Sequence, residues 1–386
     1  MTRILFLLLS LVFSLNGYSQ IIFGVNNYTE YHIGNLPIII SVPHGGNLTP
    51  AGIPDRTCNS AVNVTDLNTI ELAQQINTAF FLATGCRPYI IYNNLHRSKL
   101  DCNRNLADGA CGNPMAENAW IEFNNFINTA QASAKNEFGG KAFYIDLHGH
   151  GNPNQRLELG YLLYDYELAY SDSILNTNQY IAYSTIQNLV STNINSFKHA
   201  ELLRGINALG TLFGNEGYPS VPSLQIPFPG TTTNYFSGGY NVANHTSYAQ
   251  NNTVNGVQIE CNYTNVRDTY SHREVFSDSL VSVLSKYLNI HQNINTSNCS
   301  SVSTTQLPID QYSINISPNP ATNFIGFAFS KDLIDFEIEI MNLFGQTILK
   351  TKNQSRVNIE QFPKGIYLIK ITDQQKSIAV KRIAFQ

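Results

Sequence analysis

The sequence predicts an α/β domain, in which helices cover both faces of a largely parallel or mixed sheet, followed by a small all-β sandwich. Two observations predict this division. Between residues 21 and 292, short apolar runs alternate with segments of helical periodicity. Beyond residue 308, short strand-like runs follow one another and are separated by turn signals. We therefore expect one central domain and one tail domain.

The central region, residues 21–292, contains the elements of a single α/β domain. The apolar runs end at glycine or polar residues, as buried strands do, and the longer amphipathic segments have the length of helices. Strands are expected at Pro37–Val42, Pro88–Tyr92, Ala142–Leu147, Gly160–Tyr164 and Gly256–Cys261. Helices are expected at Val64–Ala83, Ala116–Phe138, Asn176–Ile194 and His272–Leu288.

The first 20 residues have the pattern of a signal peptide. Arg3 supplies a positive charge, Ile4–Phe13 is a short apolar stretch, and Gly17-Tyr18-Ser19 offers small residues for cleavage. The apolar stretch is too short to span a bilayer, and no later segment reaches 18 consecutive apolar residues. We expect a soluble, exported mature chain without a transmembrane segment.

Composition narrows the class of protein. Of the 386 residues, 43% are hydrophobic and only 13% are charged, and the net charge is −4. This composition is typical of a globular chain and not of a disordered one. The absence of a basic patch in the sequence argues against nucleic acid as a partner.

Six cysteines remain after removal of the signal peptide, and an even number in an exported chain permits disulfides. Cys102 and Cys111 close a short loop, and we expect them to form a bridge. Six cysteines allow 15 connectivities, so the remaining pairing stays open. None of the spacings is typical of a zinc finger, and a structural zinc bound by cysteines is not expected.

Residues 293–308 are rich in Asn, Ser and Thr and are expected to form a linker. In the tail, residues 309–386, turn signals such as Pro318-Asn-Pro separate short runs of strand character, which is typical of a small β-sandwich. Seven strands are expected: Ser313–Ser317, Asn323–Phe329, Phe336–Asn342, Thr347–Lys350, Arg356–Ile359, Gly365–Thr372 and Ser377–Ala384.

Three tail motifs carry a family resemblance: Ser317-Pro-Asn-Pro-Ala, Ile340-Met-Asn-Leu-Phe-Gly and Gly365-Ile-Tyr-Leu-Ile-Lys-Ile. Together they resemble the C-terminal sorting domain of the type IX (Por) secretion system. The resemblance implies that the type IX machinery is a partner and that the domain is usually removed during export. It also implies an extracellular or outer-membrane surface location in a Gram-negative, Bacteroidetes-type bacterium. The alternative is an ordinary accessory binding sandwich.

Two histidines in matching settings predict a catalytic metal site. His44 and His148 each end an apolar run and are each followed by glycine. Ligands of open α/β sheets bind at the carboxyl ends of strands, and imidazoles are common zinc ligands. Glycine lets backbone, water or substrate approach closely. The alternative is that two unrelated histidines happen to end strands.

A catalytic zinc needs a third protein ligand. Asp66 opens a helical segment about twenty residues after His44, although a carboxylate there also stabilises a helix N-terminus by itself. Asp55 and Glu71 are weaker candidates, and His150 is a rival ligand. Asp146 precedes His148 by two residues, so it either orients that histidine or fixes a nearby turn.

A basic cluster and a buried acid complete the candidate residues. Arg97, Asp101, Asn103 and Arg104 follow a strand and suit an acidic substrate group or a developing oxyanion; the alternative is a salt-bridged surface loop. Glu260 lies inside an apolar strand, where an acid is costly unless it is paired. It is either a general base beside a metal-bound water or the partner of Arg267 or of a cluster arginine. The segment 235–240 is Gly-rich and aromatic, which indicates a loop over a pocket.

The motifs Ser41-Val-Pro-His44-Gly-Gly, Arg97-x-x-x-Asp101-x-Asn103-Arg104, Asp146-Leu-His148-Gly, Ser237-Gly-Gly-Tyr240 and Gln258-Ile-Glu260 occur in this order. As a set they resemble the N-formylglutamate amidohydrolase family, relatives of the zinc carboxypeptidases. The resemblance implies a three-layer, mixed-sheet hydrolase domain with one zinc ion. It further implies these roles: His44, Asp66 and His148 as metal ligands, Glu260 as base, Arg97 on the scissile carbonyl, and Asn103, Arg104 and Tyr240 as substrate-binding residues.

The sequence departs from the family pattern near both histidines. Asn47 stands where the zinc carboxypeptidases have Glu, Leu48 stands where some amidohydrolases have an acid, and Gly149-His150 replaces a common Ser. We expect a secreted zinc-dependent hydrolase that cleaves the amide bond of an N-acyl amino acid or peptide-like substrate bearing a carboxylate. The alternative is an inactive relic of a zinc site that serves as a surface binding or adhesion protein. A serine hydrolase is discounted because the Gly-x-Ser-x-Gly motif is missing.

Overall fold

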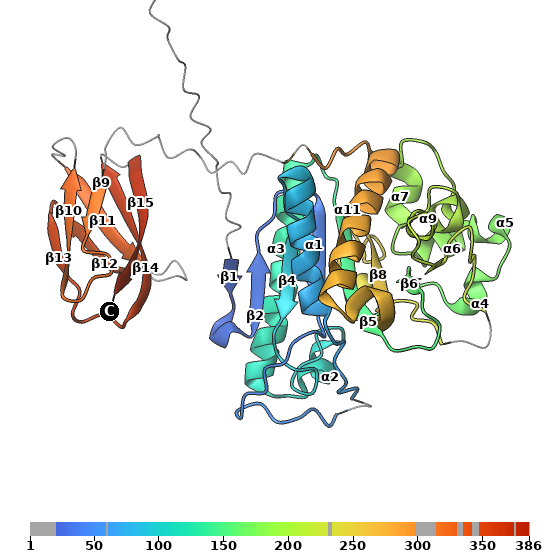
Figure 1. The fold of residues 1–386 in the computed structure, drawn as a ribbon, viewed down its shortest axis with the longest axis horizontal. Coiled ribbons are helices and arrows are strands. Elements are labelled where there is room, and N and C mark those ends of the chain that lie inside the picture. Colours follow the sequence, from blue (N-terminus) through green and yellow to red (C-terminus); the bar gives the residue numbers. More distant parts are fainter. Residues whose placement is uncertain are drawn as a thin grey trace, which may run out of the picture. The chain divides into compact units, whose positions relative to one another are not determined.

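A computed structural model describes residues 21–58, 61–230, 234–297, 299, 314–329, 335–341, 347–373 and 376–385. The chain divides into two compact units, Met1–Ser301 and Val302–Gln386 (Figure 1). The expected signal peptide, residues 1–20, and most of the expected linker, residues 293–308, lie outside the described residues.

In the described part of the first unit, eight strands form one mixed sheet of order β1-β2-β4-β3-β5-β8-β6-β7. Neighbours among β4, β3, β5 and β8 run parallel, whereas β1, β2 and β6 join antiparallel. The parallel centre brings the carboxyl ends of β3, β5 and β8 to the same edge. The strands are β1 (Ile21–Phe23), β2 (Thr29–His32), β3 (Ile38–Val42), β4 (Tyr89–Asn93), β5 (Phe143–His150), β6 (Leu157–Gly160), β7 (Ser220–Val221) and β8 (Asn255–Asn262).

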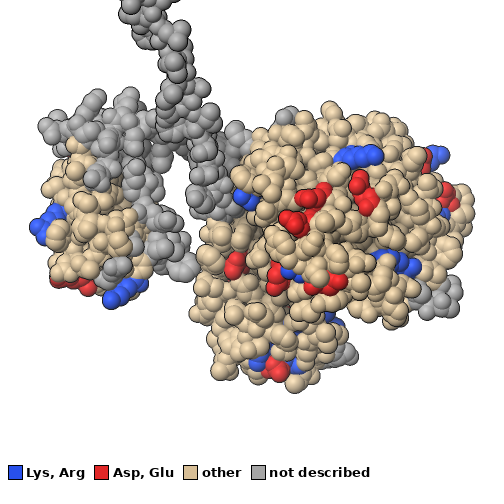
Figure 2. All heavy atoms as spheres, viewed as in Figure 1, with Lys and Arg blue, Asp and Glu red and all other residues tan. Residues whose placement is uncertain are grey.

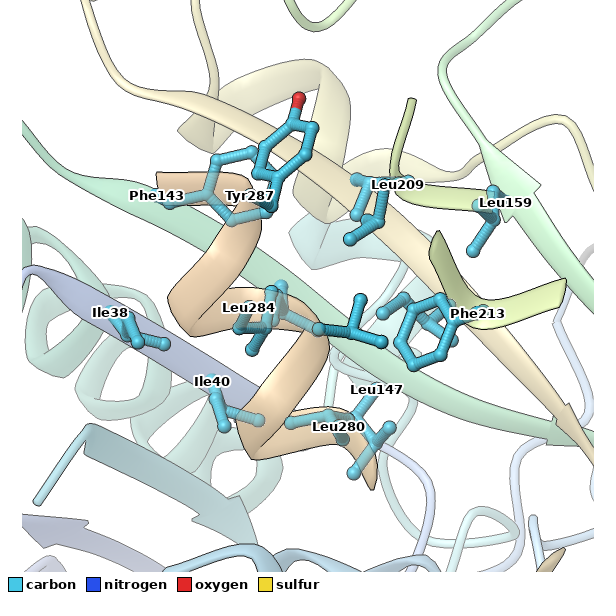
Figure 3. Close-up of a cluster of buried hydrophobic side chains, with 14 of the residues drawn as sticks. Ile38, Ile40, Phe143, Leu147, Leu159, Leu209, Phe213, Leu280, Leu284 and Tyr287 are labelled. Carbon is cyan, nitrogen blue, oxygen red and sulfur yellow. The ribbon is translucent and has the colours of Figure 1, made fainter. Parts of the chain in front are cut away.

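Helices cover both faces of this sheet, because its central strands are apolar on both sides. On one face Ile38 and Ile40 of β3 pack with residues of α1 (Thr69–Thr84) and α11 (Tyr270–Gln292). On the other face Ile39 packs with residues of α3 (Pro114–Glu137). Figure 3 shows the first of these cores, with Ile38, Ile40, Phe143, Leu147, Leu159, Leu209, Phe213, Leu280, Leu284 and Tyr287 labelled. The arrangement is a mixed α/β fold of three layers.

Short helices fill the long connections of the first unit. They are α2 (Leu106–Ala110), α4 (Asp165–Leu168), α5 (Asp172–Leu175), α6 (Asn178–Ala182), α7 (Gln187–Thr192), α8 (His199–Arg204), α9 (Leu209–Asn215) and α10 (Tyr240–His245), with the turns η1 (Val25–Asn27) and η2 (Tyr263–Arg267). Among the described helices, none combines the length and hydropathy that a membrane crossing requires. On the face drawn in Figure 2, charged side chains occur as small separated groups.

Three expected elements differ from the structure. The single helix expected at Asn176–Ile194 is wrong: α6 and α7 are separate, because Thr185 between them donates to the carbonyls of Tyr161 and Gly256. The strand expected at Gly160–Tyr164 lies earlier, at Leu157–Gly160, and the backbone turns at Leu162, where φ is +66°. The helix expected from Val64 begins only at Thr69, after a left-handed Asn68.

The expected bridge between Cys102 and Cys111 is also wrong. Cys111 pairs with Cys58, and Cys86 pairs with Cys299, each with a Cα–Cα separation of 5.6 Å. Cys102 is a free, fully buried thiol in the core beneath α3. Cys111 instead ends α2 with its side chain partly exposed, and it pairs there with Cys58.

The tail is an antiparallel β unit, and each of the seven expected runs contains a strand. These strands are β9 (Ile314–Ser317), β10 (Phe324–Phe329), β11 (Phe336–Met341), β12 (Thr347–Lys352), β13 (Arg356–Asn358), β14 (Gly365–Asp373) and β15 (Lys376–Phe385). They form one sheet of order β13-β10-β9 and another of order β12-β11-β14-β15. Ile325, Ile338 and Ile369 belong to one apolar core shared by the two sheets.

Candidate metal centre

The three predicted metal ligands meet at the carboxyl edge of the sheet. His44 follows β3, His148 lies near the end of β5, and Asp66 precedes α1. One possible ligand atom from each residue lies within 4.8 Å of the other two. Asp66 Oδ2 is 3.4 Å from His44 Nδ1 and 3.1 Å from His148 Nδ1. All three side chains are almost fully buried.

Carboxylates hold the outer nitrogen of each histidine. His44 Nε2 lies 2.6 Å from Asp101 Oδ1, and His148 Nε2 lies 2.7 Å from Asp146 Oδ2. A carboxylate accepts hydrogen bonds, so each Nε2 carries a proton. With a cation bound, each Nδ1 would present its lone pair, and the two nitrogens and the Asp66 carboxylate would converge on that cation. This donor set fits zinc, whose histidine ligands are commonly oriented by carboxylates in this way.

The register of the sheet explains why these groups meet. In the parallel β5–β8 pair, His148 stands opposite Glu260 and Asp146 stands opposite Gln258. Asp146 also stands opposite Ser41 of β3, whose hydroxyl donates to Asp146 Oδ1 over 2.5 Å. Residues opposite each other in neighbouring strands point to the same face. The sheet itself therefore positions Asp146 to orient His148, which was one of the two roles considered for it.

Asp66 is held from several sides. Its backbone N–H donates to the His44 carbonyl over 3.1 Å, and Gly149 N–H donates to Asp66 Oδ2 over 3.2 Å. Arg97 Nη1 lies 3.6 Å from Asp66 Oδ1. Burial by itself would raise the pKa of Asp66, but His44 and His148 hold it well below its usual range. Asp66 therefore presents an ionised oxygen to the two histidines.

Glu260 faces the same centre from β8. Its Oε1 accepts a hydrogen bond from Gln258 Nε2 over 2.9 Å and lies 4.0 Å from His148 Nδ1. Burial raises the pKa of Glu260 to about 7, with the negative charge of Asp66 adding to the effect and His148 opposing it. The alternative partner, Arg267, donates instead to backbone carbonyls, including those of Cys261 and His150. Among the described residues no ion pair joins Glu260 to an arginine.

Asp101 is the centre of the basic cluster. Its Oδ2 accepts from Arg97 Nε over 3.1 Å and from Arg104 Nε over 3.3 Å, and lies 3.7 Å from Arg56 Nη1. Burial alone would raise the pKa of Asp101, but His44, Arg97 and Arg56 hold it well below its usual range. Asp101 therefore joins the arginine cluster to a predicted metal ligand, a role that we did not predict. The spacing Arg97-x-x-x-Asp101 points to the arginine part of this role, whereas no local pattern points to the contact with His44.

Asn103 and Tyr240 lie on one side of the centre. Asn103 Oδ1 accepts from the N–H of Asn241, and Asn103 Nδ2 donates to Gln258 Oε1 over 3.4 Å. Tyr240 begins α10, and its ring packs 5.8 Å from the ring of Trp120. Trp120 donates to the carbonyl of Arg104 over 2.9 Å. Tyr240 thus packs on the residue that holds the Arg104 carbonyl. Tyr240 itself is not among the described lining residues of the cavity, whose wall is formed there by Gly238 and Gly239.

The rival ligands lie outside the cluster. His150 Nε2 bonds to the carbonyl of Arg156 over 2.8 Å, and its Nδ1 accepts from the N–H of Asn152, so both nitrogens are engaged. Asp55 accepts from Ser98 and Lys99 near the surface. Glu71 lies exposed on α1.

A cavity of about 590 Å³ opens over the centre. Its wall combines the three predicted ligands with charged, polar and apolar side chains. The described lining comprises His44, Val62, Val64, Thr65, Asp66, Leu67, Arg97, Asn103, Arg104, His148, Gly149, His150, Gly151, Phe236, Gly238, Gly239, Gln258, Glu260, Tyr263 and Arg267. A small organic substrate can therefore reach the histidines, Glu260 and both cluster arginines from the same space.

Comparison with known families identifies the tail. Residues 315–385 match the family model of the secretion system C-terminal sorting domain. This match confirms the resemblance seen in the tail motifs and indicates export through the type IX secretion machinery. It covers the tail and not the unit that holds the candidate metal centre. The sequence matches no curated protein at a significant level.

Three solved structures are similar to the chain. N-formylglutamate amidohydrolase from Ralstonia eutropha JMP134 is 13% identical with a TM-score of 0.38, over 64% of this chain and 91% of that one. The N-acetylmuramyl-L-alanine amidase Ami1 from Mycobacterium abscessus is 15% identical with a TM-score of 0.30, over 66% and 100%. The cell shape determinant Csd4 from Helicobacter pylori is 11% identical with a TM-score of 0.26, over 93% and 100%.

Proposed function

We propose that this protein is an exported zinc-dependent hydrolase that cleaves the amide bond of an N-acyl amino acid or peptide-like substrate bearing a carboxylate. The observation that carries the proposal is the convergence of His44 Nδ1, His148 Nδ1 and Asp66 Oδ2, with a carboxylate behind each histidine. A buried acid, Glu260, lies beside these three groups in the same cavity. Two imidazoles, one carboxylate and a neighbouring acid form the ligand set and base of a zinc hydrolase.

The overall reaction uses one water for each amide. The C–N bond breaks, a C–O bond forms to the carbonyl carbon, and the products are a carboxylate and an amine. A zinc ion held by His44, Asp66 and His148 would supply Lewis acidity and lower the pKa of a water to about 7. Glu260 takes a proton from the attacking water and returns it to the departing amine. A carboxyl with a pKa near 7 is suited to both steps at neutral pH.

Arg97 and the neighbouring residues orient the substrate. Asp101 and the carbonyl of Val64 fix the guanidinium of Arg97 beside Asp66, where its positive charge stabilises a developing oxyanion. Arg104 has about 30% of its side chain exposed, and Asp101 holds its Nε. In our proposal Arg104 binds the substrate carboxylate together with the side-chain amide Nδ2–H of Asn103. Tyr240 supports this part of the cavity from α10.

The proposal is tested by replacing the base while keeping its shape. Glu260→Gln is expected to bind one zinc per chain and to lose about 10²–10⁴-fold in turnover, because the glutamine side chain cannot take a proton from water. Glu71→Gln, which changes an exposed glutamate of α1, is the matched control and should leave turnover unchanged. Release of free amine from N-acyl amino acids measures the activity. Normal turnover by Glu260→Gln would refute the role of the base. A zinc-loaded wild type inactive on acyl amino acids and peptides would favour a binding protein instead.

A further inference from the structure

Five exposed apolar side chains line the cavity over the metal centre and form what we call the apolar rim. They are Val62, Val64, Leu67, Phe236 and Tyr263, and all of them line the same cavity as the metal centre. Each is exposed by at least 37%, and Val64 reaches 75%. Isolated exposed apolar residues are ordinary on a protein surface, but a set gathered on one concave wall marks a binding site.

Hydrogen bonds to the backbone hold one side of the rim in place. Arg97 Nη1 donates to the carbonyl of Val64 over 3.3 Å, and Arg267 Nη1 donates to the carbonyl of Leu67. Between these positions, Asp66 is tied to the metal centre. The backbone that carries Val64 and Leu67 is therefore anchored on both sides of Asp66, while their side chains are 75% and 57% exposed.

Phe236 and Tyr263 of the rim are also tied to the site. Phe236 N–H donates to Glu158 Oε2 over 3.0 Å, and Glu158 stands opposite Glu260 in the β6–β8 pair. The ring of Tyr263 lies 5.5 Å from the guanidinium of Arg267, the same side chain that holds Leu67. Phe236 and Tyr263 thus stand on segments that are connected to residues of the site.

We propose that the rim binds an apolar group of the substrate while the scissile amide lies at the metal centre. This inference rests on the proposed hydrolase function and adds the substrate class: N-acyl amino acids or short peptides that carry a long aliphatic or aromatic group. The group is either the acyl chain or the amino-acid side chain, since both flank the scissile bond. Each methylene removed from water against the rim increases binding by a factor of about three to four.

Two substrate series distinguish these sources with the full-length protein. One series lengthens the acyl group of a single amino acid from formyl to acetyl, butanoyl and hexanoyl. The other keeps an acetyl group and varies the amino acid from glycine to alanine, leucine and phenylalanine. We expect kcat/KM to rise about threefold to fourfold per methylene in at least one series. A flat response in both series from an active enzyme would overturn the proposal.

The double variant Val64→Ser/Leu67→Ser tests whether the rim causes the preference. It is expected to reduce the rise per methylene to less than half of the wild-type value. Leu82→Ser is the matched control, because Leu82 is 78% exposed on α1 and lies away from the described cavity lining. It should keep the full rise. An unchanged rise in the double variant would overturn the proposal.

A binding measurement distinguishes a failure of the apolar rim from a failure of the proposed hydrolase function. If the zinc-loaded protein hydrolyses none of these compounds, the proposed function fails, and the affinities of acetate, butanoate and hexanoate then test the rim alone. Calorimetry on the zinc-loaded chain should show a threefold to fourfold fall in Kd per methylene, lost in the double variant. Equal Kd values for the three acids would overturn the rim as an apolar subsite.

Discussion

The substitution Asp101→Asn tests the carboxylate behind His44 without changing any of the three predicted metal ligands. In the structure Asp101 Oδ1 lies 2.6 Å from His44 Nε2, a short charge-assisted hydrogen bond. Such a bond contributes about 1.5–3 kcal/mol, against about 0.5–1.5 kcal/mol for a neutral one. The asparagine amide keeps the shape of the side chain, but its hydrogen bond to His44 is weaker by about 1–2 kcal/mol. Because that bond orients the ring, zinc affinity should fall roughly tenfold.

The same substitution removes the partner of three arginines. Asp101 Oδ2 lies within 3.7 Å of Arg56, Arg97 and Arg104. Breaking a buried ion pair by removing one partner costs about 3–5 kcal/mol, so the variant should also unfold at a lower denaturant concentration. Asp146→Asn, which acts on His148 without touching the arginines, should weaken zinc binding by a similar factor with a smaller loss of stability.

Competition with a chromophoric chelator measures zinc affinity in the wild type, Asp101→Asn and Asp146→Asn. Asp55→Asn serves as the control, because Asp55 is largely exposed and has no contact with the histidines. It should bind zinc like the wild type. Our account of the histidine tautomers is refuted if folded Asp101→Asn and Asp146→Asn both bind zinc with wild-type affinity.

Two further predictions concern stability. Burial lowers the pKa of His199 to about 4, so below pH 6.5 the unfolded chain takes up a proton that the folded chain does not, and stability falls as the pH drops toward 4. This histidine should account for a loss of about 2 kcal/mol between pH 7 and pH 5, measured by urea unfolding. His199→Asn should abolish this loss of stability between pH 7 and pH 5, whereas His272→Asn, at a more exposed site, should retain it. Cys299→Ser removes a disulfide that spans 213 residues, and Cys58→Ser removes one that spans 53. The first should therefore lower the free energy of unfolding by about 1 kcal/mol more than the second. An equal loss in both variants would contradict this loop-entropy argument.

The sequence alone predicts the centre of the sheet best. The runs that end at His44 and His148 are apolar at nearly every position, and buried parallel strands have this pattern. The edge strand β7 has only two residues, and its pairing depends on neighbours far away in the sequence. The break between α6 and α7 could not be predicted from the local sequence either, because Thr185 donates to carbonyls on segments that are distant in the sequence.

The candidate site was predictable where its residues stand in recognisable local settings. His44, His148 and Glu260 end or occupy strands, and the sheet register brings the latter two together. Asp66 was placed in a helix by its periodicity, whereas it lies in the preceding turn because its N–H bonds to the His44 carbonyl. The role of Asp101 depends on a contact across 57 residues with His44, and no local pattern shows such a contact.

The zinc content of the purified protein tests the central claim most directly, with wild type beside His148→Ala. After incubation with zinc and removal of the excess, metal analysis should find about one zinc per wild-type chain. The variant, which lacks one of three converging ligands, should retain little or none under the same conditions while remaining folded by circular dichroism. A wild type without bound zinc, or a folded variant that retains it fully, would contradict the metal centre formed by His44, Asp66 and His148.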